Sequence, residues 1–183
     1  MVESINNFIL FGLIVLAVYF DLSTKKIPNA ITFPVILWGL VVYTVFGGFV
    51  GFKFTLIGFL VGLAIFLLPF ILGGMGAGDV KLMAAIGALM GWKFALKTAV
   101  ASALVGGVIV IIYSLYKKTL WTTIKSAVGL ILRPLVFILA KSFNSERLEK
   151  AHKYFSEQSV QYEKHYIPYG VAIGLGAIIV FIV

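Results

Sequence analysis

Residues 5–21 read INNFILFGLIVLAVYFD, an apolar run that ends at an aspartate. Further apolar runs follow at residues 29–46, 54–72, 80–94, 95–116 and 166–183. About 20 apolar residues are long enough to cross a bilayer core as an α-helix. Over the whole chain of 183 residues, 61% are hydrophobic and only 12% are charged. The sequence therefore predicts an all-α integral membrane protein, a bundle of about six transmembrane helices.

Residues 120–140 are apolar but carry polar side chains at helical spacing, which predicts an additional amphipathic helix lying in the membrane interface. If this segment does not cross, most of the 15 Lys and Arg residues share one side, and Lys53, Lys93 and Lys97 remain opposite. The positive-inside rule makes the lysine-rich side cytoplasmic. We therefore expect one transmembrane domain, 1–183, in the cytoplasmic membrane, with 119–164 as a cytoplasmic or interfacial connection.

Asp21 and Asp79 are the only two aspartates of the chain. The first ends the first predicted span, the second opens the fourth, and two complete crossings between them place both at the cytoplasmic face. Ionisable groups at membrane depth are costly and are functional candidates by default. Two neighbouring carboxyls share one proton, so that one activates water while the other protonates a carbonyl. We interpret them as a catalytic pair that cleaves an amide, without assigning fixed acid and base roles.

The sequences around the two acids sharpen this interpretation. Residues 21–29 read DLSTKKIPN, and residues 73–82 read GGMGAGDVKL. An acid followed by Ile-Pro-Asn, and then Gly-x-Gly-Asp-x-Lys in a membrane protein of six spans, resembles the type IV prepilin peptidases and the archaeal preflagellin peptidases. These are membrane aspartic peptidases of the Gly-x-Gly-Asp type. The resemblance continues through residues 87–92, GALMGW, and 167–174, IPYGVAIG.

The resemblance implies an aspartic endopeptidase that removes a short basic leader from pilin-like or flagellin-like precursors at the cytoplasmic membrane face. It makes Asp21 and Asp79 the catalytic residues and implies no cofactor. Larger members carry an additional cysteine-containing domain and N-methylate their product, whereas this chain has no cysteine and resembles the short, single-function forms. Residues 119–164 fit the family poorly. They could gate the site, contact the leader through Glu146, Glu149, Glu157 or Glu163, or bind lipid.

Five further residues belong to the two motifs: Pro28, Asn29, Gly76, Gly78 and Lys81. Proline suits the start of a helix, so Pro28 is expected to open the second span. The two glycines permit close backbone approach near the second acid. Lysine near a cytoplasmic helix start is interpreted first as a membrane anchor, and second as a group that tunes the acid pair.

Two other functions, and a purely structural role, fit parts of the sequence. A presenilin-type protease shares Gly-x-Gly-Asp but also needs Tyr-Asp and Pro-Ala-Leu, and here Tyr19-Phe20 precedes the first acid. An ion-coupled transporter would bind its ion at both acids. Either acid alone is equally well explained as a helix cap or interfacial charge.

Partners and ligands follow from the remaining residues. His152 and His165 lack acidic neighbours at metal-ligand spacing, so no metal is expected. The net charge of +8 is spread over membrane flanks without a nucleic-acid motif, which favours anionic lipid. Pairs of glycines four residues apart predict close helix packing, and such pairs also allow a homodimer; they are Gly47/Gly51, Gly58/Gly62, Gly87/Gly91 and Gly170/Gly174.

Overall fold

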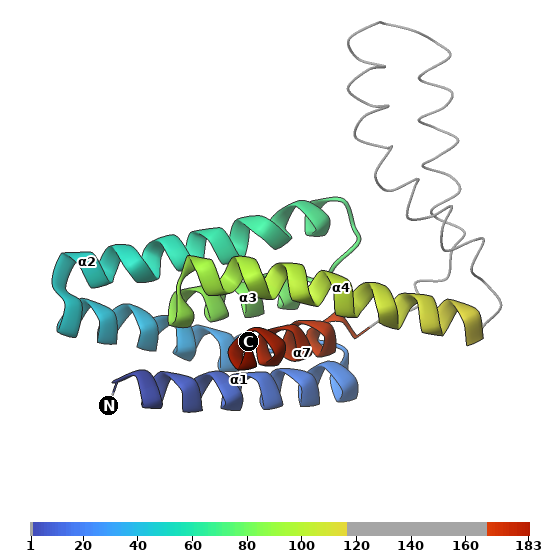
Figure 1. The fold of residues 1–183 in the computed structure, drawn as a ribbon, viewed down its shortest axis with the longest axis horizontal. Coiled ribbons are helices and arrows are strands. Elements are labelled where there is room, and N and C mark those ends of the chain that lie inside the picture. The colour runs from blue at the N-terminus through green and yellow to red at the C-terminus, as the bar shows by residue number, and fades with distance from the viewer. Residues whose placement is uncertain (1, 117–167) are drawn as a thin grey trace, which may run out of the picture. The chain divides into compact units, whose positions relative to one another are not determined.

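A computed structural model of the chain describes residues 2–116 and 168–183, and these residues form an all-α membrane protein (Figure 1). Their helices are α1 (Val2–Thr24), α2 (Asn29–Ile71), α3 (Ala77–Met90), α4 (Trp92–Tyr116) and α7 (Tyr169–Ile182). Among the described residues, α1, α2 and α4 are long and apolar enough to cross a membrane. The count of about six spans stays a prediction, and the expected interfacial helix at 120–140 lies outside the described residues.

The chain divides into two compact units. The first comprises Met1–Ile109 and Pro168–Val183, and it contains every contact discussed below. The second comprises Val110–Ile167, of which only the end of α4 is described.

Helix α2 is bent back on itself at Gly48. A straight helix of its 43 residues would be about 65 Å long, roughly twice the thickness of the hydrocarbon core. Gly48 takes φ 54° and ψ −141°, a conformation that glycine adopts without steric cost. The two arms then pack together, with the Thr55 hydroxyl donating to the Gly39 carbonyl at 3.2 Å (Figure 1). The predicted spans 29–46 and 54–72 correspond to these arms, but the predicted connection was too long because helical structure resumes directly after Gly48.

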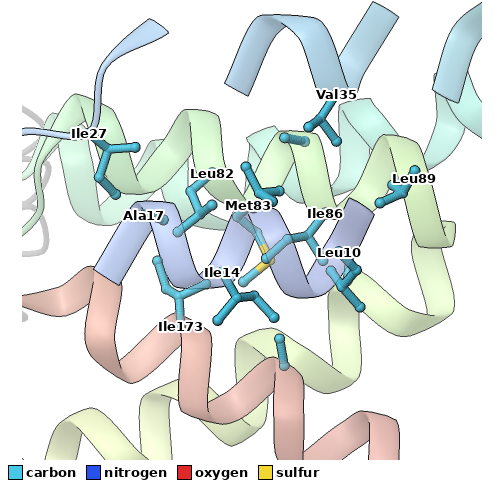
Figure 2. Close-up of a cluster of buried hydrophobic side chains, with 14 of the residues drawn as sticks. Leu10, Ile14, Ala17, Ile27, Val35, Leu82, Met83, Ile86, Leu89 and Ile173 are labelled. Atoms are coloured by element: carbon cyan, nitrogen blue, oxygen red, sulfur yellow. The ribbon is translucent and has the colours of Figure 1, made fainter. Parts of the chain in front are cut away.

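Helix α3 lies at the centre of the first unit. Apart from Lys81, its residues from Val80 to Leu89 are buried, and Figure 2 shows Leu82, Met83 and Ile86 among side chains of α1 and α7. With 14 residues it is about 21 Å long, shorter than a bilayer core, so its apolar surface is covered by protein. The predicted boundary between residues 94 and 95 is wrong. The helix ends at Met90, because Gly91 takes a left-handed φ of 84°.

Glycines let α3 approach α2 at backbone distance. A Cβ atom on Gly58 would collide with the carbonyl of Gly87, and one on Gly87 would collide with the carbonyl of Gly58. Gly62 faces the Met83 carbonyl in the same way. Small residues at helix contacts are typical of membrane proteins, where packing rather than water exclusion drives association. The predicted close packing is therefore confirmed at these glycines, but not at Gly47, which has nothing within 4 Å.

A buried polar network joins α1, α2 and α3 near the start of α1. The Asn6 amide donates to the Tyr43 hydroxyl at 3.0 Å and accepts from the Trp38 indole N–H at 3.1 Å. The Tyr43 hydroxyl in turn donates to the Leu89 carbonyl at 3.0 Å. Buried polar groups are expensive unless they are hydrogen-bonded, so this network is stable only with the three helices in one register.

The glycine contact between α2 and α3 makes a stability prediction. Gly58→Ala should lower the free energy of unfolding in detergent by about 1–3 kcal/mol, because the added methyl forces apart two backbones that cannot yield independently. Gly12→Ala in α1 is the matched control, since a Cβ there meets nothing within 4 Å and the change should be neutral or slightly stabilising. Equal stability of the two variants would contradict the packing described here.

Candidate active site

Asp21 lies in the last turn of α1 with only 2% of its surface exposed. The apolar run that predicted this helix ends at Asp21, but α1 continues to Thr24. One carboxylate oxygen of Asp21, Oδ2, accepts the backbone N–H of Gly170 at 2.8 Å. A buried carboxylate needs such donors, because leaving it unpaired away from water costs several kcal/mol.

Asp79 occupies the third position of α3 and is 8% exposed. The Gly76 N–H donates to Asp79 Oδ2 at 3.1 Å, while the Asp79 N–H donates to the Gly76 carbonyl at 3.2 Å. This reciprocal pair is a capping arrangement, and an acid at a helix N-terminus also interacts favourably with the helix dipole. The cap engages one oxygen through one N–H. Capping and chemistry at Asp79 are therefore compatible.

The two acidic motifs meet at one end of the bundle. The connection after α1 packs against the start of α3, where a Cβ on Gly78 would lie 3.0 Å from Cβ of Ile27. The Lys81 ammonium donates to the side-chain carbonyl of Asn29 at 2.8 Å, and so joins the two motifs directly. Pro28 is the residue immediately before α2. Asp21 lies in the last turn of α1, just before this connection, and Asp79 lies in the first turn of α3.

The carboxyl groups of Asp21 and Asp79 are within electrostatic reach of each other. Asp79 lies outside the three helices that qualify as membrane spans, in the first turn of α3. Burial, and then the nearby charge of Asp21, raise the pKa of the Asp79 carboxyl from 3.8 to about 6. The Gly76 hydrogen bond acts in the opposite direction and is the weakest of the three influences. The Asp79 carboxyl therefore exchanges its proton near pH 6 rather than near pH 4.

Helix α7 contributes residues that the sequence interpretation did not include in the site. Tyr169 lies within electrostatic reach of Asp79 and within hydrogen-bonding reach of Ser102 on α4. Its ring meets Phe66 edge-on, with the centroids 5.9 Å apart. Gly170, the next residue, binds Asp21 as described above. The apolar run at residues 166–183 predicted this helix, and the motif at 167–174 was the signal that could have linked it to the site.

The two motif glycines, Gly76 and Gly78, contribute space rather than an unusual backbone conformation. Gly76 and Gly78 have ordinary negative φ, and what they provide is space beside Asp79 and Ile27. The left-handed turn that leads into α3 is made instead by Gly73, with φ 78°. Within residues 2–116 and 168–183, no three potential metal ligands come together. His152 and His165 lie outside the described residues.

The fold and the site define a class: an all-α membrane protein that buries two carboxyl groups close together at one end of a helix bundle. Comparison with known families agrees with this class and narrows it. The sequence profile of the type IV leader peptidase family matches residues 8–111, more than half of the chain and both acids. The chain belongs to the type IV leader peptidase family.

Curated relatives share this region. The chain is 35% identical to a prepilin leader peptidase/N-methyltransferase of Aeromonas hydrophila over 95 residues, 48% of this chain and 32% of that protein. A protein of the same description from Burkholderia pseudomallei is 35% identical over 97 residues, 47% and 31% of the two chains. One from Dickeya chrysanthemi is 27% identical over 141 residues, 68% and 50%. The chain thus spans between a third and a half of these relatives. No solved structure matches it.

The buried acid makes a prediction about stability and pH. Because the pKa of Asp79 is about 6 in the folded protein and near 3.8 when exposed, the folded state binds more protons between these values. Stability should therefore fall as the pH rises from about 4 to about 6, and should level off above that. Thermal unfolding in detergent across this range measures the slope.

Two variants isolate the origin of this slope. Asp79→Asn removes the titrating group and should flatten the curve, whereas Glu3→Gln removes an exposed acid and should leave it unchanged. The interpretation is wrong if Asp79→Asn keeps the slope of the wild type.

Proposed function

We propose that this protein is a membrane aspartic endopeptidase that cleaves the leader peptide from type IV prepilin-like or preflagellin precursors. The observation that carries the proposal is the meeting of Asp21 and Asp79 at one end of the bundle, 58 positions apart in the sequence. Membership of the leader peptidase family supports it, as do relatives whose printed description is prepilin leader peptidase. Residues 8–111, which match the family, contain both acids and the Lys81–Asn29 contact.

The proposed mechanism uses one carboxylate and one carboxylic acid. The carboxylate removes a proton from water as the water oxygen bonds to the scissile carbonyl carbon, and the acid donates its proton to the carbonyl oxygen. The tetrahedral intermediate collapses when the carbon–nitrogen bond breaks: the leaving nitrogen takes the proton from the protonated carboxyl, and one hydroxyl of the intermediate gives its proton to the other carboxylate. No fixed roles are assigned to Asp21 and Asp79, since the titration belongs to the pair.

The proposed substrate suits the position of the site. Asp21 and Asp79 lie at helix ends rather than at the middle of the apolar helices, so a bond just outside a substrate's own membrane helix would reach them. The helices around the site present exposed apolar side chains, among them Leu22 and Leu68, beside which a hydrophobic substrate helix can lie. We place the site at the cytoplasmic face of the cell membrane, on the lysine distribution given above. Contacts of the leader with Glu146, Glu149, Glu157 or Glu163 fall outside the described residues.

Replacing either acid tests the proposal directly. Asp21→Asn and Asp79→Asn should each reduce cleavage of a co-reconstituted precursor by about 10²–10⁴-fold or more, because each removes a group that must gain or lose a proton. Leader removal is followed by the mobility of the precursor on a gel and by mass spectrometry of the product. Circular dichroism and thermal unfolding in detergent establish that each variant is folded.

Full cleavage by either folded variant would exclude a two-carboxyl mechanism. If the wild type itself leaves the precursor intact, ion flux in proteoliposomes is the next measurement. Flux that depends on both acids would support the transporter alternative instead.

Lys81 provides a second, graded test. Its hydrogen bond to Asn29 is exposed, and exposed charge-assisted contacts contribute about 1 kcal/mol or less. Lys81→Met should therefore lower kcat/KM by less than about tenfold, because Lys81 links the two motifs through Asn29 and does not transfer a proton. A loss as large as that of Asp79→Asn would make Lys81 part of the catalytic machinery.

A further inference from the structure

The N-terminal end of α7 holds one of the two acids. Gly170 is the second residue of this helix, and its N–H is one of the four that a helix leaves without an internal partner. That N–H points at Asp21 Oδ2, 2.8 Å away, and both residues are buried. Pro168, which precedes the helix, has no N–H of its own to compete for the carboxylate.

The absent side chain of Gly170 matters as much as its N–H. A Cβ atom at this position would lie 2.7 Å from Oδ2, 2.9 Å from Cγ and 3.1 Å from Cβ of Asp21. Gly170 is not among the residues with positive φ, so its backbone conformation would accept any side chain. Glycine is required here by the space that the carboxylate occupies.

Neighbouring contacts keep this helix end from withdrawing. A Cβ on Gly174, one turn further along α7, would touch the Cγ2 methyls of Ile14 and Val18 on α1, each at 3.0 Å. On the other side, a Cβ on Gly176 would lie 2.6 Å from the backbone nitrogen of Ser102 on α4. Helix α7 is therefore packed against side chains of α1 on one side and against the backbone of α4 on the other. It offers Asp21 a donor whose position is set by the bundle.

We propose that Gly170 is a positioning residue, whose N–H and missing side chain hold the Asp21 carboxylate in place for reaction with Asp79. This inference rests on the proposed function of the two acids. The hydrogen bond engages Oδ2 and so limits rotation of the Asp21 side chain. Misplacement of a reacting group by about 1 Å can cost about 100-fold in rate, so a donor at this place has a large effect on turnover.

Kinetics of Gly170→Ala test the proposal. The added methyl must displace the carboxylate, so kcat for leader cleavage should fall about 100-fold while KM changes little, because substrate binding elsewhere is untouched. Gly174→Ala is the matched control: it introduces a methyl on the same helix against α1, but against apolar methyl groups. It should lower the melting temperature without a comparable loss of kcat. Equal kcat values for the two folded variants, or a change confined to KM, would overturn the proposal.

A second measurement decides the contact without any cleavage assay. The melting temperatures of the wild type, Gly170→Ala, Asp21→Ala and the double variant form a cycle that isolates the coupling of the two positions. Asp21→Ala removes Oδ2 and Cγ and leaves only the Cβ contact at 3.1 Å, so Gly170→Ala should cost much less in that background. Equal cost in both backgrounds would refute positioning of Asp21 by Gly170. If the wild type cleaves no precursor, the proposed function fails, and the cycle still decides this contact.

Discussion

The backbone contact between α2 and α3 is the constraint on which the rest of the molecule depends. Inside a membrane, helices gain little from leaving lipid, so close packing must supply the attraction. Gly58 against Gly87 and Gly62 against Met83 bring the two helices together along most of α3. This contact holds α3, which is shorter than the bilayer core, at the centre of the first unit. It therefore determines where the first turn of α3 lies. Asp79 belongs to that turn.

Burial of two acids is a cost that the surrounding helix ends offset. Asp79 accepts an N–H from the start of its own helix, while Asp21, at the end of α1, accepts one from the start of α7. Helix N-termini carry partial positive charge, which makes both places suited to a carboxylate. Burial, and then the nearby charge of Asp21, still raise the pKa of the Asp79 carboxyl. Asp79 therefore holds a proton more readily than an exposed aspartate does.

Prediction from sequence succeeded where a signal is local and failed where it depends on tertiary contacts. Apolar length was enough to indicate a helical membrane protein, and the counting of crossings brought Asp21 and Asp79 to one end. The four-residue glycine spacing indicated the contact of Gly58 and Gly62. The end of α3 before Gly91 was not predicted, because the sequence stays apolar through this position and only the backbone φ of Gly91 differs. The bond between Gly170 and Asp21 joins positions 149 apart through a backbone N–H, a group that every residue except proline carries.

The buried amide of Asn6 has a consequence at the opposite end of its helix. Asn6 and Asp21 both belong to α1, 15 residues apart, which corresponds to about 22 Å along the helix axis. An α-helix transmits axial displacement with little compression, so sliding α1 by one residue would move the carboxylate by about 1.5 Å. Such a slide would break the hydrogen bonds of Asn6 to Trp38 and Tyr43. The network therefore prevents α1 from sliding along its axis. In this way, polar contacts remote from the site fix the axial position of Asp21 relative to α2 and α3.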